Sequence, residues 1–297
     1  MKKITFPLIS IFILFCYLPL FSGCSSNKSI KMYNVETKLI ETLDFEDYIA
    51  GVVAGEMYND WPIEALKAQC VLARTFTIDF LKNQKSKYKG ADISNDISEA
   101  QAYNKNLIND KIKQAVNETK GIVIIHNDEP INAWFHSNSG GTTELATFGL
   151  NYSETNPVYI KSIKSPETQD NSQNYSWEYT FTKGEILKAL SNIGISVTSL
   201  NSIQISEKSP SGRAIQILVG EKNINANTFR LAIGSTKLKS TLIQSITQSG
   251  ENVTFKGLGY GHGVGMSQWG AKILAQQDKD YNYIINYYFD NVKIVKN

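Results

Sequence analysis

The segment GVVAGEM at residues 51–57 places one acidic residue among apolar neighbours. Glu56 follows Val52 by four residues, so in a helix it lies on the apolar face. A carboxyl group there loses hydration, which raises its pKa and keeps it protonated near neutral pH, as a general acid requires. The alternative is an ion pair with Lys67 or Arg74 from the next helix, and the spacing alone favours that structural role.

Two glycine-containing loops carry the other polar groups that could act on a ligand. The first, residues 135–141, reads FHSNSGG, and the second, residues 257–270, reads GLGYGHGVGMSQWG. Glycines let the backbone approach a ligand closely, and amides, hydroxyls and an aromatic face suit a carbohydrate. In each loop the alternative is a tight structural turn. The candidate substrate-binding groups of the two loops are His136, Ser137, Ser139, Tyr260, His262, Ser267 and Gln268.

Residue type and spacing argue against several other chemistries for these loops. His262 stands where a dinucleotide-binding fingerprint needs its third glycine. The stretch from Gly265 to Gly270 is one residue longer than a serine nucleophile elbow. A metal site made of His136, His262 and one acid stays open as an alternative, but the chain contains no HExxH and no CxxC motif.

The spacing of apolar residues predicts strands mixed with helices. The predicted helices are 44–57, 62–80, 109–120, 182–191, 226–233, 269–277 and 281–288. The predicted strands are 32–43, 122–125, 131–135, 177–181, 203–206, 214–219, 253–255 and 292–295. Because strands and helices do not alternate regularly, we predict the α+β class, with the elements around one cleft and a possible second, smaller lobe at 151–231.

The N-terminus predicts export. Lys2 and Lys3 precede a mostly apolar run at 6–21, and Ser-Gly-Cys follows, ending at Cys24. A basic start, a short apolar middle and small residues before a cut are typical of a signal peptide. A cysteine after Ser-Gly also resembles a lipobox, in which Cys24 is lipidated; an uncleaved signal anchor is the alternative, and either places the body on the outer face of the membrane. The predicted division of the chain is a signal at 1–23, a tether at 24–31 and a folded domain at 32–297.

The charge balance gives no reason to expect nucleic acid as a partner. The chain of 297 residues has 30 basic and 28 acidic residues. The first 23 residues hold two lysines and no acid, which leaves 28 basic against 28 acidic residues in the rest. A neutral body with only three arginines lacks both the field and the bidentate groups that bind phosphates.

Three blocks together resemble the stage II sporulation protein D family and its amidase-enhancer relatives. They read GVVAGEMYNDWPIEALKAQCVLARTF, AWFHSNSGGTTE and GLGYGHGVGMSQWGA, in the order found in the family. The resemblance runs from about Val35 to the C-terminus. It implies a lytic transglycosylase that acts during sporulation engulfment on peptidoglycan strands stripped of stem peptides, beside a partner amidase.

The resemblance also assigns roles to residues. It carries the catalytic glutamate to Glu56, against the preference from spacing alone. It adds Gln101 and Tyr103 to the predicted substrate-binding groups. Lys67 and Arg74 are counted among the predicted substrate-binding groups as well, and they are expected either to orient Glu56 or to hold its helix to its neighbour.

One segment departs from a pattern in the family. Some clostridial members bind zinc through cysteines and a histidine in a segment that ends Cys-Gln-x-Tyr. The corresponding positions here are Ser94, Glu99 and Ala100. Because serine and alanine cannot replace thiolate ligands, we predict no zinc and no other cofactor, and a loop held by packing or hydrogen bonds.

Two other functions stay open at this stage. The chain could bind glycan strands and stimulate a separate amidase without cutting any glycosidic bond. It could also be a metal-dependent wall hydrolase that uses the two loop histidines, in which case a chelator would abolish its activity.

Overall fold

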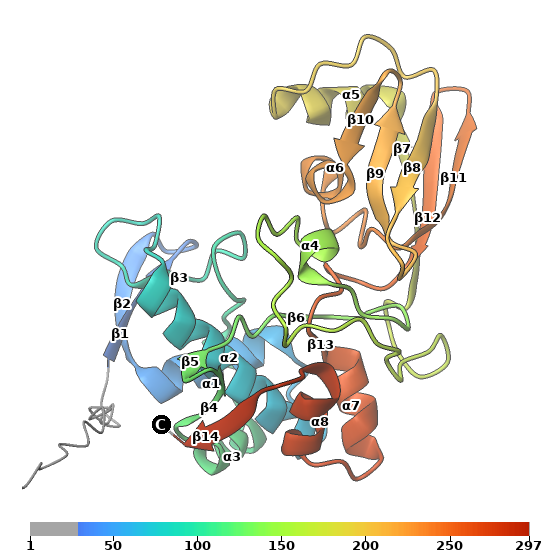
Figure 1. The fold of residues 1–297 in the computed structure, drawn as a ribbon. Helices are drawn as coiled ribbons and strands as arrows, with labels where there is room; N and C mark the ends of the chain where they lie inside the picture. Colours follow the sequence, from blue (N-terminus) through green and yellow to red (C-terminus); the bar gives the residue numbers. More distant parts are fainter. Residues whose placement is uncertain (1–28, 297) are drawn as a thin grey trace, which may run out of the picture.

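The computed structural model describes residues 29–296, which form two lobes with separate hydrophobic cores (Figure 1). Eight α-helices and several small sheets confirm the predicted α+β class. Within the described range, no helix is both long and apolar enough to cross a membrane. The predictions for the signal and Cys24 fall outside that range. The first strand begins at Ser29, so residues 29–31 of the predicted tether belong to the folded body.

Helices form most of the first lobe, and local capping residues explain where they start. Asp44 accepts hydrogen bonds from the backbone N–H groups of Glu46 and Asp47 and so begins the first helix. Pro62, whose missing N–H does no harm at a helix start, stands directly before the long second helix. The helices of this lobe are α1 (Phe45–Glu56), α2 (Ile63–Asn83), the 3-10 turn η1 (Lys105–Leu107), α3 (Asp110–Glu118), α7 (Gln268–Gln276) and α8 (Tyr281–Tyr288).

Two small sheets complete the first lobe, in the orders β2-β1-β3 and β14-β4-β5. The predicted single strand at 32–43 is wrong: residues 35–38 form a turn, with a positive φ of 60° at Lys38, and two antiparallel strands flank it. The turn contains no glycine, proline or asparagine that would mark it in the sequence. The strands are β1 (Ser29–Asn34), β2 (Leu39–Asp44), β3 (Ile93–Ser94), β4 (Ile122–His126), β5 (Glu129–Pro130) and β14 (Lys293–Lys296).

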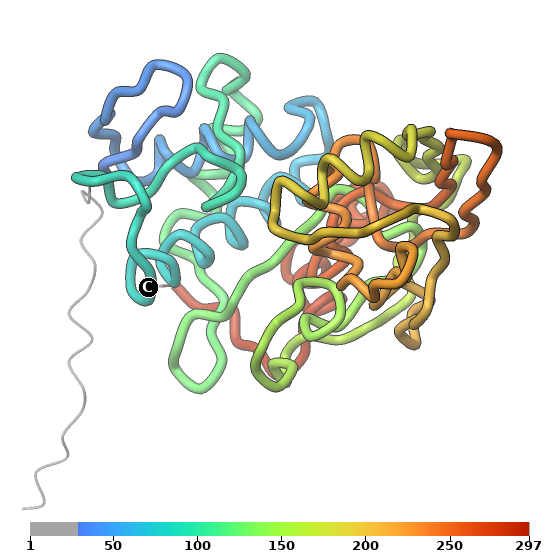
Figure 2. The backbone as a smooth tube through the Cα atoms, turned by 90° about the horizontal axis from the view of Figure 1, so that it is seen from above, coloured from blue at the N-terminus to red at the C-terminus, as the bar shows by residue number. Residues whose placement is uncertain are grey.

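The second lobe has two three-stranded sheets, ordered β10-β9-β8 and β11-β12-β7, and two helices around a core that reaches from Trp177 to Phe255. Figure 2 shows it beside the first lobe from above. The predicted range 151–231 overlaps this lobe only in part. The predicted helix at 182–191 is present, and it begins with a capping box of Thr182 and Glu185. The elements are β7 (Ser176–Thr182), α5 (Lys183–Asn192), β8 (Ile203–Lys208), β9 (Ala214–Val219), β10 (Lys222–Asn225), α6 (Ala226–Ile233), β11 (Ile243–Ser249) and β12 (Asn252–Leu258).

A short parallel strand pair brings the two glycine-containing loops together between the lobes (Figure 1). The pair consists of β6 (Phe135–His136) and β13 (Met266–Ser267), with His136 opposite Ser267. Beyond it, the backbone N–H of Asn138 donates to the carbonyl of Tyr260 at 3.0 Å, and the N–H of Tyr260 donates back at 2.7 Å. The segment between β6 and β7 includes the short helix α4 (Ala146–Gly149). Loops more than 120 residues apart in sequence therefore form one surface next to α1.

Candidate active site

Glu56 lies in a cleft of about 470 Å³ at the C-terminal end of α1. Its side chain is half-buried. Oε1 accepts a hydrogen bond from the backbone N–H of Ala102 at 2.7 Å, and Oε2 accepts one from the side-chain amide of Gln268 at 3.2 Å. The cleft is lined by Glu56, Phe76, Ile97, Ser98, Glu99, Ala100, Gln101, Ala102, Trp134, Phe135, His136, Leu150 and His262.

Two glycines of α1 explain how residues 101–104 reach Glu56. A Cβ atom at Gly51 would overlap the ring of Tyr103. One at Gly55 would lie 2.7 Å from the backbone nitrogen of Tyr103 and 2.8 Å from the carbonyl carbon of Ala102. Residues 101–104 therefore cross directly over the bare face of the helix, and this crossing points the N–H of Ala102 at Glu56.

Gly55→Ala is expected to lower the free energy of unfolding by about 1–3 kcal/mol, because the new methyl group meets backbone atoms that cannot move aside cheaply. Alanine is otherwise the better helix former by about 1 kcal/mol. Gly184→Ala in α5 is the matched control: a Cβ there meets nothing closer than 4.0 Å, so this change should leave stability unchanged or raise it. Urea denaturation measures both. Equal behaviour of the two variants would contradict the close crossing.

The environment of Glu56 favours its protonated form. Burial raises the pKa of Glu56 above its usual value, and the hydrogen bonds from Ala102 and Gln268 offset this only in part. Within residues 29–296, Glu56 has no lysine, arginine or histidine ion-pair partner within 4.0 Å. Glu56 can therefore carry a proton at pH values where an exposed glutamate has lost it.

This raised pKa predicts how stability changes with pH. A carboxyl group whose pKa is higher in the folded chain binds protons more tightly when folded. Its contribution to stability therefore falls as the pH rises above 4.5, the ordinary pKa of a glutamate. Glu56→Gln removes that loss. We expect the variant to gain stability relative to the unmodified chain as the pH is raised from 4 to 7, as measured by thermal unfolding. A difference that does not vary with pH would contradict the raised pKa.

Lys67 and Arg74 lie away from Glu56 and hold α2 to its neighbours. The guanidinium of Arg74 is buried and donates to both carboxylate oxygens of Glu46, at 3.0 and 2.7 Å, which ties α2 to α1. Lys67 pairs with Glu64 at 2.7 Å and with Glu118 of α3 at 2.6 Å. The expectation that they contact substrate is therefore corrected, because their polar groups are already engaged elsewhere; the alternative, that they hold helices together, describes them.

His136 and His262 both line the cleft, with ring centroids 5.6 Å apart. The backbone of Val264 sets the tautomer of each ring. Its carbonyl lies 3.1 Å from Nδ1 of His136, so that nitrogen carries the proton. Its N–H donates to Nδ1 of His262 at 3.0 Å, so the proton of His262 is on Nε2. The two imidazoles therefore carry their protons on different nitrogens, Nδ1 in His136 and Nε2 in His262.

Both histidines are neutral at physiological pH. Burial lowers the pKa of His136 to about 3, and the charge of Arg213 acts in the same direction. Burial also holds the pKa of His262 well below its usual value. Nε2 of His136 is buried and has no hydrogen-bond partner within the described part of the chain. This lone pair is an unused acceptor beside the cleft.

The hydroxyls of Ser139 and Ser267 donate hydrogen bonds to the buried carboxylate of Glu167, a residue that the sequence did not single out. Oε1 of Glu167 accepts from the N–H of Ser139 at 2.8 Å and from the hydroxyls of Ser139 and Ser267, each at 2.6 Å. Oε2 accepts from Ser165 at 2.5 Å. The expected contact of these two serines with substrate is corrected, because their hydroxyls already bind Glu167 and so join the two loops. Glu167 lies in an irregular polar stretch, where no periodicity singled it out.

Some of the other predicted groups line the cleft, and the rest make contacts that support it. Gln268 touches Glu56, and Gln101 lines the cleft while its amide donates to Thr77 at 3.1 Å. The ring of Tyr103 stacks on that of Tyr48, with centroids 5.9 Å apart. Ser137 and Tyr260 are half-buried and contribute backbone contacts between the loops, at Trp269 N and Asn138.

Hydrogen bonds hold the loop that contains Ser94, Glu99 and Ala100. Glu99 accepts from the hydroxyl of Ser86 at 2.9 Å and from the N–H of Lys87 at 2.8 Å. Ser94 is fully buried in β3 and accepts from the N–H of Asp96, and the N–H of Ala100 donates to the Asp96 carbonyl. These groups supply no thiolate and one carboxylate that is already bonded, so they do not fit a zinc ion.

Arg213, a residue of the second lobe, is a further group that sequence reasoning missed. It is buried, and its guanidinium lies flat against Gly263, where a Cβ would come within 2.6 Å of it. Its Nη2 donates to the carbonyl of Ser139 at 2.6 Å. Glu144 supplies nearby negative charge, and it is itself bonded by Ser209 and Ser211. Through Arg213 the second lobe therefore contacts both glycine-containing loops, at Ser139 and at Gly263.

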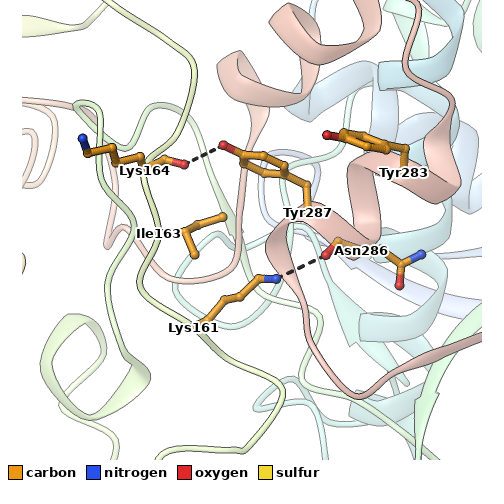
Figure 3. A pocket seen from close by; sticks show the side chains of 6 residues that line it. All are labelled: Lys161, Ile163, Lys164, Tyr283, Asn286 and Tyr287. Atoms are coloured by element: carbon orange, nitrogen blue, oxygen red, sulfur yellow. Dashed lines mark hydrogen bonds between the residues drawn. The ribbon is translucent and has the colours of Figure 1, made fainter.

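A separate groove of about 470 Å³ lies between α8 and residues 161–164 and is lined by lysine, tyrosine, asparagine and isoleucine side chains (Figure 3). Tyr287 donates its hydroxyl to the Lys164 carbonyl at 2.8 Å. Lys161 is bonded to the Asn286 carbonyl at 3.3 Å and to Asp290 at 2.6 Å. Neither a carboxylic acid nor a histidine lines this groove, so it holds no counterpart of Glu56.

Comparison with known proteins identifies the family. A family model described as "Stage II sporulation protein" matches residues 33–126, which include Glu56, and a model for a domain of unknown function matches residues 158–265. An uncharacterized protein of Brachyspira hyodysenteriae is 34% identical over 89% of this chain and 70% of its own length. Stage II sporulation protein D of Bacillus subtilis is 30% identical over 91% of this chain and 80% of its own length. The amidase enhancer of the same organism is 29% identical over 81% of this chain and 39% of its own length. The predicted resemblance is confirmed, and the chain belongs to the stage II sporulation protein D family.

Proposed function

We propose that the chain is a peptidoglycan lytic transglycosylase that cleaves the bond between N-acetylmuramic acid and N-acetylglucosamine and leaves 1,6-anhydro ends. The observation that carries the proposal is Glu56: a half-buried carboxyl group with a raised pKa, in a cleft, without a cationic partner among the described residues. A carboxylic acid in this state can donate a proton to a leaving oxygen near neutral pH.

In the proposed reaction Glu56 acts twice. Its carboxyl group first protonates the bridging oxygen, and the bond to C1 of the muramic acid breaks through an oxocarbenium-like state. The 6-hydroxyl of the same sugar then attacks C1, and the Glu56 carboxylate takes the proton of that hydroxyl. Glu56 gives up one proton and then takes one back, and no water is consumed. The second carboxylate that a hydrolase needs is therefore unnecessary.

The other polar groups of the cleft lining either hydrogen-bond to Glu56 or have partners elsewhere in the chain. Gln268 and the N–H of Ala102 hold the Glu56 carboxylate when it is ionised. The neutral imidazoles of His136 and His262 add no charge to the cleft lining. Glu99 is the other carboxylate on the cleft lining, but both of its oxygens accept hydrogen bonds from its own loop. We assign it to loop structure.

The proposed setting is the cell wall during sporulation engulfment. Relatives named stage II sporulation protein D and amidase enhancer support a role in wall remodelling beside an amidase. An amidase would supply strands stripped of stem peptides, which we propose as the substrate. Export through residues 1–23 and anchoring at Cys24 or by an uncleaved signal would place the chain on the outer face of the membrane. The proposed chemistry uses no metal or other cofactor.

The second candidate function is a glycan-binding activator of an amidase, favoured by the relative that carries the name amidase enhancer. Incubating the purified chain with stripped glycan strands separates the two proposals. Shortening of the strands by the chain alone supports the transglycosylase. Strands that are bound but keep their length, together with a faster amidase when the chain is added, would support the activator and overturn the enzyme.

A further inference from the structure

A second hollow, of about 610 Å³, opens next to the catalytic cleft. Its lining includes Tyr58, Trp61, Gln173, Trp269, Lys272 and Gln276. It shares no lining residue with the cleft, and the proposed reaction does not use it. Aromatic rings and amides dominate this surface.

The hollow is joined to the catalytic groups along two stretches of chain. Tyr58 comes two residues after Glu56, just beyond the end of α1. On α7, Gln268 touches Glu56, and Lys272 and Gln276 follow it at intervals of four residues on the same helix face. Eight residues of helix span about 12 Å. A ligand that follows this face of α7 from Glu56 therefore runs into the hollow.

The rings in the hollow form a packed platform with one open face. Trp61 and Trp269 meet edge to face, with centroids 4.9 Å apart, and Tyr58 lies 5.5 Å from Trp61. The two tryptophans are buried, but 55% of Tyr58 is exposed, and its hydroxyl donates to Gln173 at 3.2 Å. The ammonium group of Lys272 sits 4.3 Å from the Trp269 ring. Rings of this kind bury the apolar face of a pyranose, while amides bond its polar edge.

The charges in the hollow indicate which kind of sugar fits. Lys272 is its one lysine, and within residues 29–296 no carboxylate lies within 4.0 Å of that ammonium group. Asp60 also lines the hollow. One positive and one negative group leave no net charge, which favours a neutral N-acetylated sugar over an anionic one.

We propose that this hollow is a distal saccharide subsite of the cleft, which binds a neutral N-acetylated pyranose further along the strand whose bond is cut at Glu56. The proposal rests on the proposed function for its substrate, but it is tested by binding alone. Tyr58 provides the open stacking face. A short saccharide fills only the cleft, while a long one reaches both sites, so Tyr58 affects the binding of long saccharides only.

The test uses the full chain in detergent carrying Glu56→Gln, which prevents turnover. Calorimetry measures the affinity for two probes without stem peptides: the disaccharide of N-acetylglucosamine and N-acetylmuramic acid, and its octasaccharide. Adding Tyr58→Ala is expected to weaken octasaccharide binding about tenfold and to leave disaccharide binding unchanged, while Tyr58→Phe keeps both. Tyr283→Ala is the matched control, because Tyr283 is 47% exposed in the separate groove of Figure 3.

Equal effects of Tyr58→Ala on both probes, no effect on either, or failure of the octasaccharide to bind would overturn the subsite. The outcome is distinct from that of the catalytic proposal. If Glu56→Gln still cleaves strands, then the role of Glu56 falls, and a length-dependent loss at Tyr58, measured at a temperature too low for turnover, still supports the subsite.

Discussion

Glu56→Gln is expected to lower the rate of glycan-strand cleavage about 10³-fold while the fold is kept. General acid–base catalysis contributes about 10²–10⁴-fold, and here one residue supplies both the acid and the base. The amide cannot donate a proton to the bridging oxygen, but it fills the same space and can still accept from the N–H of Ala102, 2.7 Å away in the unmodified chain. The rate of strand shortening and the circular dichroism spectrum measure the two effects.

Glu99→Gln is the control that isolates the one-carboxylate mechanism. Glu99 lines the same cleft, so in a two-carboxylate hydrolase its loss would be as damaging as that of Glu56. We expect the rate to change less than tenfold. Full activity of Glu56→Gln would refute the assignment of the acid, and equal losses in the two variants would refute catalysis by a single carboxylate.

Glu167→Ala is expected to lower the free energy of unfolding by about 3–5 kcal/mol. The substitution leaves three hydroxyl donors and the N–H of Ser139 without their buried acceptor, and each unsatisfied buried group costs about 1–3 kcal/mol. Water that enters the space left by the side chain recovers part of this sum. Because Glu167 binds a serine of each glycine-containing loop, removing its carboxylate should also make the cleft less rigid.

Glu178→Ala on β7 is the matched control for that measurement. Glu178 pairs with Lys256 at 3.0 Å, and both side chains are more than half exposed. Such a surface pair contributes little, so the change should stay within about 0.5 kcal/mol. Chemical denaturation of the two variants gives both values. A Glu167→Ala variant as stable as Glu178→Ala would show that the carboxylate does not hold the loops.

Local signals were sufficient to predict much of the fold. The predicted helices at 44–57 and 182–191 are both present, and they begin at the capping residues Asp44 and Thr182. The turn at 35–38 was missed because it contains no glycine, proline or asparagine, and a positive φ at Lys38 is not a strong sequence preference. The second lobe was placed inaccurately because its core joins strands from Trp177 to Phe255, and such long-range pairing leaves no local pattern.

The candidate site, like the fold, was predicted only in part. Glu56, His136 and His262 were found from residue type and motif, and the structure brings all three to one cleft. Glu167 and Arg213 could not be found, because a buried charged residue is recognised only by its partners, and those partners come from distant segments. The same limitation made Ser139 and Ser267 look like ligand contacts, although their hydroxyls are taken by Glu167.

The most direct test of the central claim is the mass of the cleavage products. Glycan strands stripped of stem peptides are incubated with the chain, and the new ends are identified by mass spectrometry. We predict 1,6-anhydro ends, lighter by one water than reducing ends, because the muramic acid 6-hydroxyl closes the ring in place of water. Reducing ends would contradict the transglycosylase reaction and point to a hydrolase with Glu99 as the second carboxylate.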